Sequence, residues 1–133
     1  MPPMPQAEPR AQERERPLPT AMVVEDEAII AMSLEDALSD KGYRVVGPFS
    51  ACAAALAALE TSTPDLAILD AVLSDGPCLD LARALRGRGV PFMIYSGADA
   101  FDEHAPELDG VPWVEKPSSL EIVLKAALRL VAR

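Results

Sequence analysis

Short apolar runs alternate with segments of helical periodicity along most of the chain. Five runs are too short for helices and are bounded by turn residues, which predicts strands at residues 21–24, 44–46, 66–69, 91–95 and 112–114. The run at 66–69 is apolar at every position. Strands buried on both faces have this pattern, which is typical of a parallel sheet covered by helices.

The segments after the first two runs are predicted helices. Residues 28–40 place Ile30, Leu34 and Leu38 on one face, and Gly42 follows as a terminating residue. Residues 51–60 are rich in Ala and Leu, and Ser50 precedes them as a predicted N-cap.

Two further helices are predicted in the second half of the chain. One opens at Gly76-Pro77, with Pro in the first helical position. The other begins at a predicted capping box, Ser118 to Glu121. Their predicted buried positions are Leu79, Ala82 and Leu85 in the first, and Leu120, Val123, Leu124, Ala127 and Leu128 in the second.

The fourth of the five strand–helix units is weak. Residues 98–111 are acidic, lack an apolar stripe and are interrupted by Pro106, which predicts a short or mobile fourth helix. The strand–helix alternation as a whole predicts an α/β fold with a doubly wound parallel sheet.

Composition divides the chain into two parts. Residues 1–19 hold six prolines and few apolar side chains, so we expect a disordered N-terminal tail. Residues 20–133 are long enough for one domain with a single core.

Charge and cysteine content narrow the class of function. The net charge of −9 argues against binding nucleic acid or an anionic membrane surface. Neither a signal peptide nor a membrane-length apolar run is recognisable. Cys52 and Cys78 have no metal-type spacing, and we expect reduced thiols in a cytoplasmic protein.

Polar residues follow four of the five predicted strands. Glu25 and Asp26 follow the first, Asp70 the third, Ser96 the fourth and Lys116 the fifth. The carboxyl ends of parallel strands meet at one rim, which is where open α/β sheets bind ligands.

The charges of this group predict its chemistry. Three carboxylates at the rim repel one another, and the single ammonium of Lys116 offsets only one of them. A hard divalent ion such as Mg²⁺ suits the remainder, and one carboxylate can then attack phosphorus. The metal and Lys116 would balance charge on the transferring group, and Ser96 would donate to one of its oxygens.

At these positions the chain resembles the response-regulator receiver family of two-component signalling. The matching motifs are VVEDE at 23–27, DLAILDAVLSDG at 65–76, PFMIYSG at 91–97 and WVEKP at 113–117. The fourth strand is also similar to a subgroup with the motif P-F-x-F-A-T-G. The resemblance implies a flavodoxin-like (βα)5 fold with strand order 2-1-3-4-5.

The resemblance also implies a role for each site residue. Asp70 would be the phosphoacceptor, and Glu25, Asp26, Asp70 and the carbonyl of Val72 would be ligands of Mg²⁺. Ser96 would be the switch hydroxyl, Lys116 the conserved-type lysine and Trp113 the switch aromatic. Glu25 and Ser118 depart from the family pattern, which more often has Asp and an aromatic residue there.

The implied function is a phosphorylation switch. A histidine kinase or histidine phosphotransfer protein would donate the phosphoryl group, and the output would be a contact with a downstream protein. The domain would assist only its own phosphorylation and dephosphorylation. Phosphorylation is expected to draw Ser96 inward and to let Trp113 follow. Apolar Val72 predicts slow loss of phosphate.

Two other functions remain open at this point. A scaffold of the same fold that is never phosphorylated is favoured by Glu25 and Ser118. A phosphatase with an aspartyl-phosphate intermediate is disfavoured, because Val72 stands where such enzymes place a second acid. The oligomeric state is left open.

Overall fold

A five-stranded parallel sheet forms the centre of the molecule. In the computed structural model, residues 18–97 and 106–132 are described. The strand order is β2-β1-β3-β6-β7, which confirms the predicted order 2-1-3-4-5 when the two short strands β4 and β5 are set aside. The strands are β1 Thr20–Val24, β2 Arg44–Phe49, β3 Leu66–Leu69, β6 Phe92–Ser96 and β7 Trp113–Glu115.

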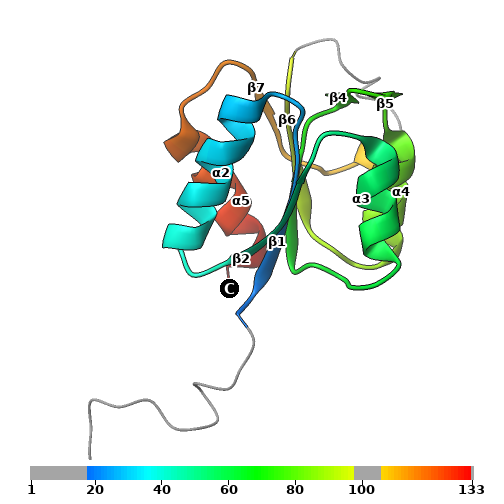
Figure 1. Cartoon of the computed structure of the whole chain (residues 1–133), viewed down its shortest axis with the longest axis horizontal. Helices are drawn as coiled ribbons and strands as arrows, with labels where there is room; N and C mark the ends of the chain where they lie inside the picture. Colours follow the sequence, from blue (N-terminus) through cyan, green and yellow to red (C-terminus); the bar gives the residue numbers. More distant parts are fainter. Residues whose placement is uncertain (1–17, 98–105, 133) are drawn as a thin grey trace, which may run out of the picture.

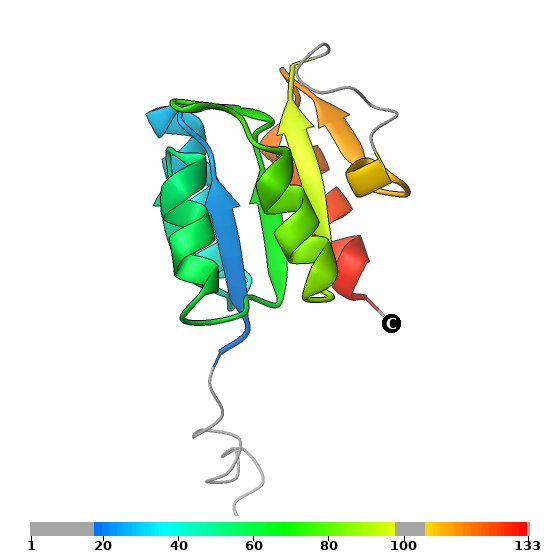
Figure 2. The ribbon, with the colours of Figure 1, turned by 90° about the vertical axis from the view of Figure 1, so that its right-hand side faces the viewer.

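Helices cover both faces of this sheet, as the doubly wound prediction requires. Helices α2 (Ala28–Asp40) and α5 (Leu120–Val131) pack on one face, and α3 (Cys52–Leu59) and α4 (Leu79–Gly87) on the other (Figure 1). In the view of Figure 2, α3 and α4 lie side by side in front of the strands. The chain therefore forms three layers around two apolar cores.

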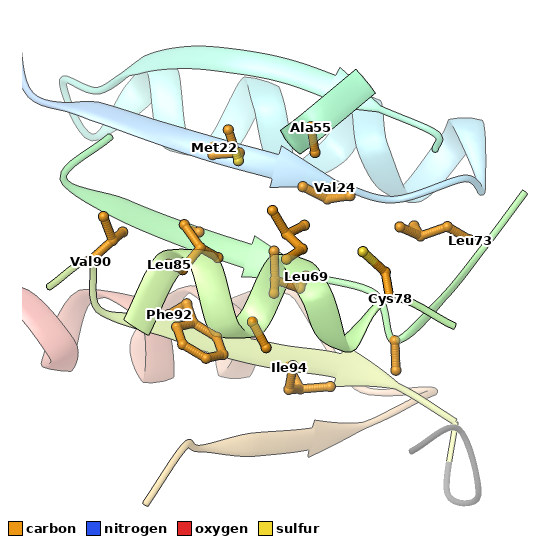
Figure 3. Packing of buried hydrophobic residues seen from close by; sticks show 14 of the residues in the cluster. Met22, Val24, Ala55, Leu69, Leu73, Cys78, Leu85, Val90, Phe92 and Ile94 are labelled. Atoms are coloured by element: carbon orange, nitrogen blue, oxygen red, sulfur yellow. The ribbon is translucent and has the colours of Figure 1, made fainter. Parts of the chain in front are cut away.

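Alternation along the strands divides the side chains between these cores. Met22 and Val24 of β1 pack towards α3 and α4, whereas Ala21 and Val23 pack towards α2 and α5. Figure 3 shows the α3/α4 side, where Leu69, Phe92 and Ile94 lie among other buried side chains. The burial of both faces explains why the strand sequences are continuously apolar.

The C-terminal end of α2 and the N-terminal end of α5 test two predictions about helix ends. Gly42 has φ +90° and its N–H donates to the Ser39 carbonyl at 3.0 Å, so α2 ends as predicted. The predicted capping box of α5 is wrong, because Ser119, not Ser118, is the N-cap and accepts from the Ile122 N–H. This shift leaves Leu120 37% exposed at the start of the helix rather than buried.

The predicted start of α4 is also wrong. Gly76–Pro77 forms strand β5, which pairs antiparallel with β4 (Val72–Leu73), and α4 begins only at Leu79. Leu79 is half-buried, and Leu81 lies in the core beside Ala82 and Leu85. The segment after β3 is thus a short hairpin, which we call the 72–77 hairpin.

Contacts with this hairpin determine how α3 begins. Its N-cap is Ala51, and the predicted cap from Ser50 does not form. The carboxylate of Asp75 instead accepts from the N–H groups of Cys52 and Ala53, at 2.8 and 3.1 Å. A side chain from the hairpin therefore supplies the cap that we expected from the preceding residue.

The expectation of reduced thiols is contradicted by the structure. Cys52 and Cys78 form a disulfide between the start of α3 and the residue before α4, with Cα atoms 5.8 Å apart. The spacing of 26 residues gave no signal for this pairing, because only the βα topology brings the starts of α3 and α4 together.

Two sequence predictions fall largely outside the described residues. The predicted tail, 1–19, lies outside them up to residue 17, and the Pro19 carbonyl already accepts from the Arg44 N–H at 2.8 Å. The predicted fourth helix lies outside them over residues 98–105, and its described part contains the 3-10 turn η1 (Pro106–Leu108). Within the described ranges, no helix has the length and apolarity needed to cross a bilayer.

Candidate phosphoacceptor site

Asp70 lies directly after β3, at the carboxyl-end rim of the sheet. Its backbone N–H donates to the Val24 carbonyl at 2.7 Å, which continues the β1–β3 pairing up to the site. Carboxylate oxygen Oδ1 accepts from the Ser96 hydroxyl at 2.7 Å and from the Val72 N–H at 3.1 Å. The residue is only 8% exposed, so these contacts fix its direction.

Lys116 connects Asp70 to two other acids. Its Nζ lies 3.0 Å from Asp70 Oδ2, 2.8 Å from Glu25 Oε1 and 2.5 Å from Glu27 Oε2. The residue follows β7, and its N–H donates to the Ser96 carbonyl at 2.9 Å. Strand pairing therefore positions both Lys116 and Ser96.

Glu25 owes its position to the ends of β1 and β2. Its N–H donates to the Phe49 carbonyl at 2.8 Å, and its Oε2 accepts from the Glu27 N–H at 3.0 Å. Strand β2 is irregular between Val46 and Phe49, and Gly47 there has φ +105°. A Cβ on Gly47 would lie 2.7 Å from the Val23 carbonyl, so only glycine fits.

The two buried acids differ in protonation. Burial raises the pKa of Glu25 from 4.5 to about 7, although its contact with Lys116 works in the opposite direction. Burial also opposes ionisation of Asp70, but hydrogen bonds from Ser96, Lys116 and Val72 together outweigh it and hold the pKa of Asp70 below 3.8. Asp70 is therefore ionised at neutral pH and available as a nucleophile.

Lys116 stays charged at neutral pH. Burial by itself would lower the pKa of Lys116, but the contacts with Glu25, Glu27 and Asp70 raise it above its ordinary value. A fixed positive charge thus faces the Asp70 carboxylate at the position where negative charge would gather on an incoming group.

The acids at the rim suit a hard metal ion. Glu25, Asp26 and Asp70 each offer a carboxylate oxygen, and these oxygens lie within 4.8 Å of one another. When fully ionised, these three acids carry −3 and Lys116 offsets +1. Oxygen donors with excess negative charge fit Mg²⁺, and exposed Asp26 leaves the site open to solvent.

The structure brings most of the predicted site residues together. Glu25, Asp70, Ser96 and Lys116 form one hydrogen-bonded group, with Asp26 at its exposed edge. Val72 joins it through its N–H group. Trp113 is half-buried and packs on the α3/α4-side core.

Ser96 already points into the site. It is 2% exposed and donates to Asp70, and its inward movement on phosphorylation stays a prediction. Its side chain needs no large movement to reach a group on Asp70.

Two residues at the site were not predicted. Glu27 contacts Lys116, and its place in the run Glu25-Asp26-Glu27 was the available signal. Tyr95 is the other: its hydroxyl donates to the Ser118 carbonyl at 3.0 Å and accepts from the Ser118 N–H at 3.2 Å. The Lys116 Nζ also lies 5.5 Å from the centre of the Tyr95 ring.

Fold and site together define a phosphoryl-accepting signalling domain, and comparison with known proteins agrees. The family model "Response regulator receiver domain" matches residues 21–128, so this chain belongs to that family. Receivers in general accept a phosphoryl group on an aspartate, act as phosphoacceptors rather than enzymes, and interact with kinases or phosphotransfer proteins.

Individual proteins of known sequence or structure are also similar to this chain. It is 32% identical over 117 residues to "Probable transcriptional regulatory protein TcrX" of Mycobacterium tuberculosis, covering 83% of this chain and 50% of that protein. The solution structure of SdrG from Sphingomonas melonis is 35% identical in sequence, with a TM-score of 0.72. The match covers 86% of this chain and 98% of the SdrG chain. SdrG from Pseudomonas melonis in a BeF3-activated conformation is 36% identical, with a TM-score of 0.66. This match covers 84% of this chain and 94% of the SdrG chain.

The curated relatives are longer proteins. The chain spans about half the length of those it matches, 50% of TcrX and 56% of "Transcriptional regulatory protein PdtaR". Their similarity therefore concerns the receiver part.

Proposed function

We propose that Asp70 is the phosphoacceptor of this receiver and that Mg²⁺ supports the transfer. The observation that carries the proposal is the setting of the Asp70 carboxylate. It is ionised, it receives hydrogen bonds from Ser96 and Val72, and it faces the Lys116 ammonium. The acids beside it form a group that suits a divalent ion.

The transfer is a nucleophilic displacement at phosphorus. A carboxylate oxygen of Asp70 forms the new O–P bond as the P–N bond of a donor phosphohistidine breaks, and the imidazole nitrogen takes up a proton. Lys116 and Ser96 then interact with the phosphoryl oxygens. Glu25, Asp26, Asp70 and the Val72 carbonyl would hold Mg²⁺, which supplies charge compensation at those oxygens.

Phosphoryl uptake from acetyl phosphate tests this assignment. The chain should gain the mass of one phosphoryl group in the presence of Mg²⁺, and EDTA should prevent the gain. Asp70→Asn should abolish it, whereas the control Asp36→Asn, at an exposed position of α2, should keep it. Uptake by Asp70→Asn at the wild-type rate would refute the assignment.

The phosphorylated state should be long-lived. Val72 is 43% exposed and follows Asp70 by two residues, so its apolar side chain would hinder an attacking water. We expect Val72→Asn to shorten the lifetime of phospho-Asp70 severalfold, with uptake retained. A wild-type half-life of seconds without a phosphatase would contradict this explanation.

Ser96 and Trp113 are the residues that we propose transmit the signal. On phosphorylation, Ser96 would exchange its hydrogen bond with Asp70 for one with a phosphoryl oxygen, and Trp113 would repack. The changed surface would bind a downstream protein. We place the protein in a bacterial cytosol, with a histidine kinase or phosphotransfer protein as its donor and no direct contact with nucleic acid or membrane.

Glu25 favours one competing function, a scaffold that is not phosphorylated. The raised pKa of Glu25 means that a proton competes for this metal-site oxygen near neutral pH. A scaffold would show no uptake from acetyl phosphate or from a kinase at any Mg²⁺ concentration, including above pH 8, where Glu25 is ionised.

A further inference from the structure

One partner of the disulfide, Cys78, lies at the end of the segment that begins with Asp70. This segment runs from Asp70 through the 72–77 hairpin to Cys78, which directly precedes α4. Cys78 is 4% exposed and lies near Leu73 in Figure 3, at the carboxyl-end side of the core. Its partner, Cys52, is the first residue of α3.

Noncovalent contacts attach the same segment to the start of α3. Ser74 donates to the Ser50 carbonyl through its N–H at 3.0 Å and through its hydroxyl at 2.8 Å. Asp75 accepts from Cys52 and Ala53. The disulfide adds a third, covalent attachment at position 78, so the hairpin is held at successive points along its length.

The attachment affects Asp70 because Val72, near the other end of the segment, forms a hydrogen bond with the Asp70 carboxylate. The Val72 N–H donates to Asp70 Oδ1, and Val72 belongs to the anchored hairpin. Opening of the hairpin would therefore remove one of the groups that fix the carboxylate.

The two cysteines differ in exposure. Cys78 is buried and Cys52 is half-buried, so an external thiolate would attack the disulfide from the side of Cys52. The chain has two cysteines, and both are used in this bond, so no third thiol competes for either.

We propose that Cys52 and Cys78 form a reversible disulfide that controls the mobility of the segment from Asp70 to Cys78. The consequence for phosphoryl uptake at Asp70 rests on the function proposed above. In the linked state the Val72 N–H stays in place and the site is preorganised. In the dithiol state the hydrogen bonds of Ser74 and Asp75 are the attachments that remain, within the described ranges, between the hairpin and the start of α3.

A low-molecular-weight disulfide such as oxidised glutathione is the oxidant. The thiolate of one cysteine attacks it, which forms a mixed disulfide and releases one glutathione thiolate. The second protein thiolate attacks the mixed disulfide and releases another. Two protein thiols are oxidised, one glutathione disulfide is reduced to two glutathiones, and the two protons move from protein to glutathione.

The first experiment concerns the link itself and needs no phosphorylation. The full chain is equilibrated in glutathione buffers of varied ratio and analysed by thiol alkylation and mass, then by hydrogen exchange. We expect full interconversion of dithiol and disulfide, and amide exchange at 72–78 about tenfold slower in the linked state. Equal exchange in both states, or no bond at any ratio, would overturn the proposal.

Cysteine variants and the chemically reduced wild type serve as controls for one another, because both lack the disulfide. The double variant with Cys52→Ser and Cys78→Ser has no thiol, so it should exchange like the reduced wild type at every glutathione ratio. Because reduction of the wild type needs no substitution, a variant that fails to fold does not decide the outcome. Amides of α2, on the opposite face of the sheet, should exchange alike in both states after correction for overall stability.

The second experiment measures uptake from acetyl phosphate in both redox states. We expect about threefold faster uptake by the linked form, and no redox effect in the variant that carries both Cys52→Ser and Cys78→Ser. Equal rates in both states would remove the regulatory part of the proposal. No uptake in either state, together with slower exchange in the linked state, would refute the proposed function and leave the redox link standing.

Discussion

The two sides of Asp70 are built from different interactions. On the side of β1 and β7, Lys116 is within ion-pair distance of Glu25, Glu27 and Asp70. On the side of the 72–77 hairpin, the attachments are hydrogen bonds to and from backbone groups and a disulfide. We call these the ionic side and the anchored side.

This difference shows how the domain can respond to charge without losing its shape. Energies on the ionic side depend strongly on protonation, metal and a new phosphoryl group. The anchored side depends on backbone geometry, and in the disulfide-linked state Asp75 is the ionisable side chain among the attachments described above. Charge would therefore reorganise one side while the other holds Asp70 in place.

The largest effect is expected where the ionic side meets β2. Gly47→Ala would place a Cβ 2.7 Å from the Val23 carbonyl at a φ of +105°. The shift would also reach Phe49, whose carbonyl accepts from the Glu25 N–H. We expect a loss of about 3–4 kcal/mol in the free energy of unfolding, measured by urea denaturation.

Gly87→Ala is the matched control for this substitution. Nothing lies within 4 Å of the added Cβ at Gly87, which ends α4. Its effect should be near zero or slightly stabilising. Equal losses in both variants would show that the irregularity of β2 does not support the site.

The next effect concerns the single cation of the ionic side. Lys116→Met leaves Glu25 and Asp70 buried without their ammonium partner, and we expect a loss of about 2–3 kcal/mol in metal-free buffer. Added Mg²⁺ should recover part of this loss, because a divalent ion supplies the missing charge. Exposed Lys125→Met should change stability little in either buffer.

Protonation should distinguish the two acids of the ionic side. The pKa of Glu25 is raised from 4.5 to about 7, so the unfolded chain ionises first and stability falls as pH rises through that interval. We expect a fall of roughly 3 kcal/mol in the metal-free chain. The lowered pKa of Asp70 acts oppositely, giving stability above pH 3.8 that is lost at lower pH.

Glu25→Gln separates these contributions. The variant should lose the fall between pH 4.5 and about 7 and keep the acid-side loss attributed to Asp70. Urea denaturation across this range measures both. Parallel pH profiles for wild type and variant would assign the fall to another group.

The sequence was most informative where local pattern and tertiary environment agree. Leu66–Leu69 is buried at every position, and its apolar run predicted that strand with its bounds. Helix α2 ends at Gly42 as predicted. The reason is local: the N–H of a glycine just past the helix donates to a carbonyl of the last turn. The order of polar residues after the strands predicted Glu25, Asp70 and Lys116 of the ionic side for the same reason, since parallel strands deliver them to one rim.

The anchored side was largely missed because distant residues determine it. Gly76-Pro77 fits a helix start locally, yet pairing with Val72–Leu73 makes it a strand. Ser50 is a good N-cap by type, but its carbonyl accepts from Ser74 and its place is taken by Asp75. Glu27 was missed for a related reason, because a run of three acids does not show which of them reach Lys116.

Asp75 provides the smallest and last test of the comparison. Its carboxylate caps α3 through Cys52 and Ala53, and these N–H groups lower its pKa. The capping energy is therefore present above pH 3.8 and is lost as pH falls through the lowered pKa of the folded state. Asp75→Ala should lower the melting temperature by roughly a few degrees at neutral pH.

The redox state should change the local effect of this substitution. In the linked chain the disulfide still holds the start of α3 against Cys78, so the Cys52 and Ala53 amides should exchange only slightly faster in Asp75→Ala. In the reduced chain Ser74 is the remaining polar attachment of the hairpin to the start of α3 among the described residues, and the same amides should exchange much faster. An equal increase in both states would mean that cap and disulfide act independently, because coupled attachments give non-additive effects and separate ones do not.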